Sequence, residues 1–119
     1  MVQTRSVLDT PIFHKLYELY KLLHAYRSLI PKSQRYSLWL KCENTLLILL
    51  ETLIEIGHKK DNDKLKSLYI ISDKLDVLKV FFRLAKDTRT IDSKQYLAIQ
   101  TLIQEIGKMV GGWIKSVPQ

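Results

Sequence analysis

Cysteine is almost missing from the chain, because Cys42 is the only one among 119 residues. No disulfide can form within one copy, so we expect a reducing compartment, the cytoplasm. Long apolar runs are missing too: the run from Leu46 to Leu50 is bounded by Glu43 and Glu51, whereas a membrane span needs roughly 20 residues. The opening MVQTRSVLDTP has no apolar signal-peptide core. We expect a soluble protein with no secretory signal and no membrane partner.

A catalytic or metal-binding constellation is missing as well. His14 and His24 lie ten residues apart on one predicted helix, too far to share a metal ion. Glu55 and His58 form a single Glu-x-x-His motif, whereas di-iron bundles use that motif twice with two further glutamates. Cys42 sits in an apolar pattern and reads as a small buried side chain, and the glycines show no phosphate-loop spacing. We expect no enzyme activity, no metal site and no cofactor.

The composition that remains is typical of one compact domain. Hydrophobic residues make up 46% and charged residues 26% of the chain, both ordinary for a globular protein. Helix-start and helix-stop signals divide it into four predicted segments, at 11–30, 33–57, 64–86 and 93–115. We predict a single domain over residues 9–115, with short tails at 1–8 and 116–119.

The predicted segment ends carry capping signals. Asp-Thr precedes Pro11, which is typical of a helix start with proline in the first turn. Gly57 is a predicted C-cap, and Asp92 or Ser93 is a predicted N-cap of the last segment. The polar stretch HKKDND, residues 58–63, is a predicted loop.

Each segment carries apolar residues at alternating steps of three and four, the spacing of left-handed helix-bundle packing. These seam residues are Ile12, Leu16, Leu19, Leu23, Tyr26 and Ile30; Trp39, Cys42, Leu46, Leu49, Leu53 and Ile56; Leu68, Ile71, Leu75, Leu78, Phe82 and Ala85; and Ile99, Leu102, Ile106, Met109 and Trp113. Because the connections are short, neighbouring helices should run antiparallel. The sequence predicts an all-α, up-down-up-down four-helix bundle.

The two middle segments each carry a second apolar stripe beside the seam. These stripes are Leu40, Leu47, Leu50 and Ile54 in one segment, and Ile70, Val77, Phe81 and Leu84 in the other. Four large side chains, fully buried, contribute roughly 6–12 kcal/mol, and soluble monomers seldom expose such a patch. Self-association through these residues is one interpretation, and a wide core face within one subunit is the other.

The chain is basic, with a formal net charge of +7. Two groups of cations are predicted to contact a nucleic acid or protein partner: Lys79, Arg83, Lys86 and Arg89, and Arg27, Lys32, Arg35 and Lys41. Asp76 and Asp87 partly offset the first group. A third group, Lys59, Lys60, Lys64 and Lys66, crowds the middle loop, with Asp61 and Asp63 beside it. Such cations would position a nucleic acid by its phosphates without reading its sequence. A plain solubility surface is the alternative.

Four stretches of the chain resemble the accessory variability determinant proteins of diversity-generating retroelements. They are PKSQRYSL (31–38), KLDVLKVFFRLAKD (74–87), KQYL (94–97) and EIGKMVGGWIKS (105–116). The resemblance covers nearly the whole chain, and its most specific part is Gly-Gly-Trp-Ile-Lys together with Lys-Gln-Tyr-Leu.

This resemblance implies a barrel-like homopentamer whose basic surface binds a reverse transcriptase and its RNA or DNA, without strong sequence preference. It implies a role in mutagenic retrohoming, in which template RNA is copied with adenine-directed errors and the product replaces a variable repeat. The accessory protein itself catalyses nothing.

A sister family encoded in ribosomal-RNA intervening sequences shares the bundle and a similar Pro-Lys-x-x-Arg-Tyr-x-Leu entry. Its second helix typically carries a small-residue motif ending in Asn-Ile-Ala-Glu-Gly, whereas this chain has ENTLLILLETL at 43–53, which favours the retroelement interpretation. The alternative function is a structural or regulatory bundle oligomer that binds an acidic protein or ribosomal RNA.

Overall fold

Four long helices and two short helical segments form the fold in a computed structural model that describes residues 6–118. The elements are η1 (Val7–Asp9), α1 (Pro11–Arg27), α2 (Lys32–Arg35), α3 (Leu38–Ile56), α4 (Asp61–Asp87) and α5 (Ser93–Ser116). No strand occurs within that range, and the predicted all-α class is confirmed.

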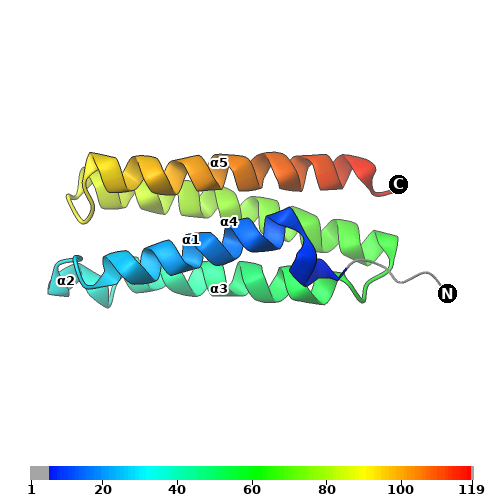
Figure 1. The fold of residues 1–119 in the computed structure, drawn as a ribbon, viewed down its shortest axis with the longest axis horizontal. Coiled ribbons are helices and arrows are strands. Elements are labelled where there is room, and N and C mark those ends of the chain that lie inside the picture. Colours follow the sequence, from blue (N-terminus) through cyan, green and yellow to red (C-terminus); the bar gives the residue numbers. More distant parts are fainter. Residues whose placement is uncertain (1–5, 119) are drawn as a thin grey trace.

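The four long helices run up, down, up and down along the longest dimension of the molecule, which measures 51 × 23 × 21 Å (Figure 1). Helix α1 packs against α3 and α5, and α4 packs against the same two helices. Short α2 and the α4–α5 connection lie at one end of the bundle, and the α3–α4 connection lies at the other (Figure 1). The predicted antiparallel topology is confirmed.

The core confirms the predicted seams in α3 and α4, where all twelve seam residues are buried. In α1, Tyr26 is only half-buried. In α5 the predicted Ile99 and Ile106 are buried and Trp113 is half-buried. At two positions the prediction was wrong by one residue, because Ile103 and Val110 are buried in place of their half-buried neighbours Leu102 and Met109. In each pair, Leu102/Ile103 and Met109/Val110, both residues are apolar, so steps of three and four fit either residue. In the packed bundle the β-branched residue of each pair is the buried one.

The predicted helix starts at Thr10 and Asp92 are confirmed. The Thr10 side chain accepts a hydrogen bond from the Phe13 backbone N–H at 3.3 Å. Asp92 and Gln95 form a reciprocal capping box, in which each side chain accepts from the other's backbone N–H, at 2.7 and 2.9 Å. These bonds satisfy donors that a helix start leaves without partners.

Two predicted boundaries were wrong. The segment expected to run unbroken from Ser33 is split into α2 and α3, because the Ser37 hydroxyl donates to the carbonyls of Ser33 and Gln34 and its backbone leaves helical geometry. The predicted 58–63 loop is shorter, because α4 already begins at Asp61. Carboxylates in a first turn interact favourably with the helix dipole, which explains the earlier start.

Both flanks of the predicted domain also pack on it. Val7 lies against the core, and a Cβ added at Gly57 would approach its side chain to 3.1 Å, so the glycine lets η1 come close. Val117 is buried at the other flank. Residues 1–5 and 119 of the predicted tails lie outside the described residues.

Candidate nucleic-acid and partner interface

The fold brings one predicted group of cations and the last two residues of the other group to the same end of the bundle. We call this the basic end: it comprises Arg27, Lys32, Arg35, Lys41, Lys86 and Arg89. Leu29 and Pro31, from the connection after α1, line a hollow of about 670 Å³ together with Lys86 and Arg89 from the end of α4. The end of α4, which carries Lys86 and Arg89, therefore lies beside the connection between α1 and α2, at the end of the bundle where α2 lies (Figure 1).

Lys79 and Arg83 continue the basic surface along α4. The Lys79 Nζ lies 3.5 Å from an Asp76 carboxylate oxygen, and the Arg83 Nε lies 4.0 Å from one of Asp87. These are exposed pairs within one helix, and such pairs contribute only about 0–1 kcal/mol. Both cations can therefore exchange a carboxylate for a phosphate at little cost.

The side chains of Arg27 and Arg35 make contacts within the subunit. The Arg27 Nη1 lies 3.6 Å from Oε1 of Glu43, whose carboxylate is buried, and its guanidinium sits 5.7 Å from the Tyr36 ring centre. The Arg35 Nη2 donates to the Ile30 carbonyl at 3.1 Å. These contacts hold the α1–α2–α3 corner together, whereas Lys32 and Lys41 are exposed beside it.

Arg89 occupies a backbone conformation that normally favours glycine, with φ at 60°. The Thr90 N–H donates to the Ala85 carbonyl at 2.8 Å and the Arg89 N–H to the Lys86 carbonyl at 3.0 Å, which makes a Schellman motif at the end of α4. A non-glycine residue in this left-handed region costs about 1–3 kcal/mol. Arginine therefore makes this turn less stable than glycine would, which makes Arg89 a candidate for a contact that uses its charge.

Replacing Arg89 by glycine is expected to stabilise the fold by about 1 kcal/mol and to weaken binding of RNA or DNA. Urea denaturation and a nucleic-acid titration measure the two effects. Arg89→Ala is the matched control, because it removes the same charge without relieving the backbone. If Arg89→Gly binds RNA and DNA as tightly as the unaltered protein does, Arg89 is not part of the interface.

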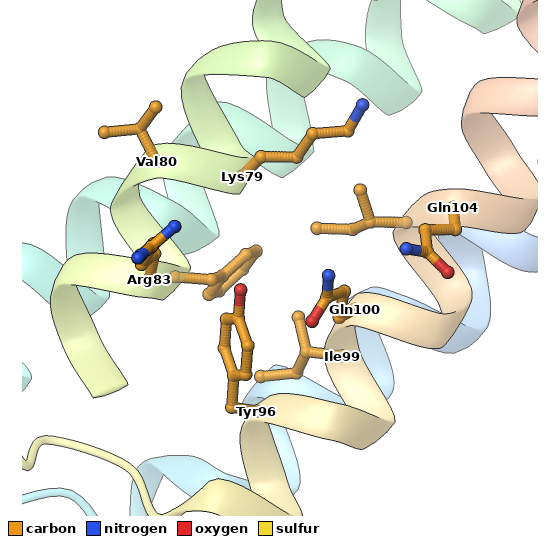
Figure 2. Close-up of a pocket in the computed structure, with 9 residues that line it drawn as sticks. Lys79, Val80, Arg83, Tyr96, Ile99, Gln100 and Gln104 are labelled. Carbon is orange, nitrogen blue, oxygen red and sulfur yellow. The ribbon is translucent and has the colours of Figure 1, made fainter. Parts of the chain in front are cut away.

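A cavity of about 320 Å³ opens between α4 and α5 beside these cations (Figure 2). Lys79 and Arg83 lie on its α4 side, and Tyr96, Gln100 and Gln104 on its α5 side. The sequence predictions missed the three α5 residues. Their spacing of four places them on one face of a helix, but only the packing of α5 against α4 sets that face beside the cations.

The predicted second stripes are partly exposed in the single subunit. Leu47, Ile54, Ile70, Val77 and Leu84 each expose 42–47% of their surface. The other three, Leu40, Leu50 and Phe81, are half-buried. The bundle core takes in only part of these stripes, because Leu50 and Phe81 pack against it while the five exposed residues do not.

The two stripes lie on different faces of the subunit. Leu47 and Leu50 line an apolar hollow of about 660 Å³ with Tyr17 and Tyr20 of α1. Val77 lies about 200° around α4 from Lys79, which lines the α4–α5 cavity. The α3 stripe therefore borders the α1–α3 groove at Leu47 and Leu50, and the α4 stripe lies on the side of α4 that faces away from the α4–α5 cavity.

The titratable groups in the core offer no nucleophile. Burial, with a smaller contribution from the neighbouring Glu43, raises the pKa of the Cys42 thiol to about 12. The thiol is therefore protonated at neutral pH. In residues 6–118, no three His, Cys, Asp or Glu side chains gather as a metal ion would require. None of the helices described there is long and apolar enough to cross a membrane.

Comparison with protein families identifies the family to which the chain belongs. The bAvd-like family model matches residues 11–117, which spans all four long helices and the basic end. A comparison with curated proteins finds no match. Since the matched region covers most of the sequence, the chain belongs to the bAvd-like family, the accessory variability determinants of diversity-generating retroelements.

Proposed function

We propose that the chain is a non-catalytic accessory protein that binds the reverse transcriptase and its RNA and DNA through the basic end and the adjoining row Lys79–Arg83. Binding would be to phosphates and hence without strong sequence preference, and it would support mutagenic retrohoming in the cytoplasm. The observation that carries the proposal is the hollow in which Leu29 and Pro31, from the connection beside the 27–41 cations, lie against Lys86 and Arg89 at the end of α4.

We propose further that copies assemble into a ring, with the pentamer of the family as the expected form. A two-fold dimer pairs one patch with itself, whereas a head-to-tail ring pairs two different patches. The α3 stripe over the α1–α3 groove and the α4 stripe form such a pair of different patches. A ring would set several basic ends side by side, which multiplies phosphate contacts on one nucleic acid.

Replacing Lys79, Arg83 and Lys86 together by glutamine is expected to weaken binding of both RNA and DNA while the fold survives. Each phosphate contact contributes about 0.7–0.9 to the slope of log affinity against log salt, so the slope should become shallower by about 2–3. Gel-shift titrations over a range of salt concentrations measure it. The matched control is the triple glutamine variant of Lys60, Lys64 and Lys66, which lie toward the opposite end (Figure 1).

Equal affinity and equal salt slope in the two triple variants would reject this surface as the interface. Failure of the unaltered protein to retain either RNA or DNA at near-physiological salt would favour the alternative, a basic surface that meets an acidic protein. Retention of ribosomal RNA alone would favour a role like that of the intervening-sequence family.

A further inference from the structure

The cavity between α4 and α5 has the construction of a small ligand site. Its volume, about 320 Å³, lies at the small end of the about 300–1,000 Å³ range of ligand pockets. Its floor is apolar, because Phe82, Ile99 and Ile103 are buried core residues. Its polar groups are confined to side chains around that floor (Figure 2).

Those polar side chains match the parts of one nucleotide. Tyr96 presents a half-buried aromatic ring on which a base can stack. The Gln100 amide, beside it in Figure 2, offers both a donor and an acceptor to the edge of a base. Lys79 and Arg83, on the opposite helix, supply cations for the phosphate. The ammonium group of Lys86, which does not line the cavity, lies 5.1 Å from the Tyr96 ring centre and places a further cation beside that ring.

We propose that this cavity receives one unstacked nucleotide of a single-stranded RNA or DNA, with the base against Tyr96 and Gln100 and the phosphate near Lys79 and Arg83. The inference rests on the proposed function and adds a base-binding site to its phosphate contacts. A glutamine amide can rotate to present either its donor or its acceptor, so the site tolerates different bases. Removing a base from a duplex costs a few kcal/mol, so the site favours single strands.

The test compares a short DNA single strand with an otherwise identical strand whose sugars carry no bases. The two strands have the same phosphates, so a purely electrostatic surface binds them equally. The unaltered protein is expected to bind the strand with bases about tenfold more tightly, a typical contribution of one stacked base. Tyr96→Leu should bind both strands alike, at the affinity of the unaltered protein for the strand without bases.

Tyr69→Leu is the matched control, because Tyr69 is an exposed tyrosine on α4 and does not line the cavity. It should keep the tenfold preference. Gln100→Leu should lower the preference in part, and circular dichroism checks that each variant is folded.

Equal binding of the two strands by the unaltered protein would overturn the nucleotide site and leave the phosphate interface intact. A tenfold preference that survives in Tyr96→Leu would also overturn it. Failure to bind either strand would overturn the proposed function together with this inference.

Discussion

Replacing Arg27 by alanine is expected to destabilise the folded subunit by about 3 kcal/mol or more. Glu43 is only 2% exposed, and its carboxylate oxygens accept no hydrogen bond in the described structure. Arg27 is the cation beside it, at 3.6 Å. Removing one partner of a buried ion pair costs about 3–5 kcal/mol, because the remaining charge is left without compensation. Urea denaturation measures the loss.

The double variant Arg27→Ala/Glu43→Leu should recover most of that stability, because it removes the buried charge as well. Lys32→Ala, at an exposed position of the same basic end, should change stability by less than about 0.5 kcal/mol. If Arg27→Ala and Lys32→Ala proved equally stable, the ion pair would have no structural role. A loss of nucleic-acid binding in an Arg27 variant therefore counts as evidence for the interface only if the variant is shown to be folded.

Placing a glutamate in either apolar stripe is expected to dissociate the proposed ring while leaving the subunit folded. Leu47 and Val77 are exposed in the single subunit, so a charge there meets water when the copies are apart. In an interface the same change loses about 1.5–3 kcal/mol of apolar burial and adds the cost of a buried charge. Sedimentation of Leu47→Glu and of Val77→Glu should each give single subunits.

The two variants together test the head-to-tail arrangement. Each keeps intact the stripe that the other has lost, so an equimolar mixture should form dimers of one copy of each and nothing larger. Leu97→Glu is the control, because Leu97 is an exposed leucine of α5 outside both stripes, and it should leave the assembly unchanged. A mixture that stays entirely as single subunits would contradict the pairing of these two surfaces.

Spacing along the sequence was enough to predict the bundle but not the exact faces. Steps of three and four predicted the buried side of α3 and α4 correctly, because all twelve seam residues are buried although apolar residues of the second stripes lie beside several of them. In α5, apolar residues stand side by side at Leu102 and Ile103 and at Met109 and Val110, so the pattern did not decide between them. Which of the two is buried depends on the neighbouring helices.

The candidate site was only partly predictable for a related reason. The sequence shows which residues are basic, but it does not show which of them form ion pairs or hydrogen bonds within the subunit. Glu43, one acid inside an apolar seam beside Cys42, was the signal that a partner such as Arg27 had to exist. The packing of α5 against α4 is what places Tyr96, Gln100 and Gln104 beside Lys79 and Arg83. The sequence alone does not show that these residues lie together.

We propose that one folded subunit has more apolar surface than it can bury, so that copies assemble and set their basic ends side by side. Light scattering of the purified protein at micromolar concentration tests it most directly. We expect a single species with a mass several times the 14.0 kDa of one subunit. For the pentamer, the mass would be five times that of one subunit. A stable, monodisperse species of 14.0 kDa would contradict it.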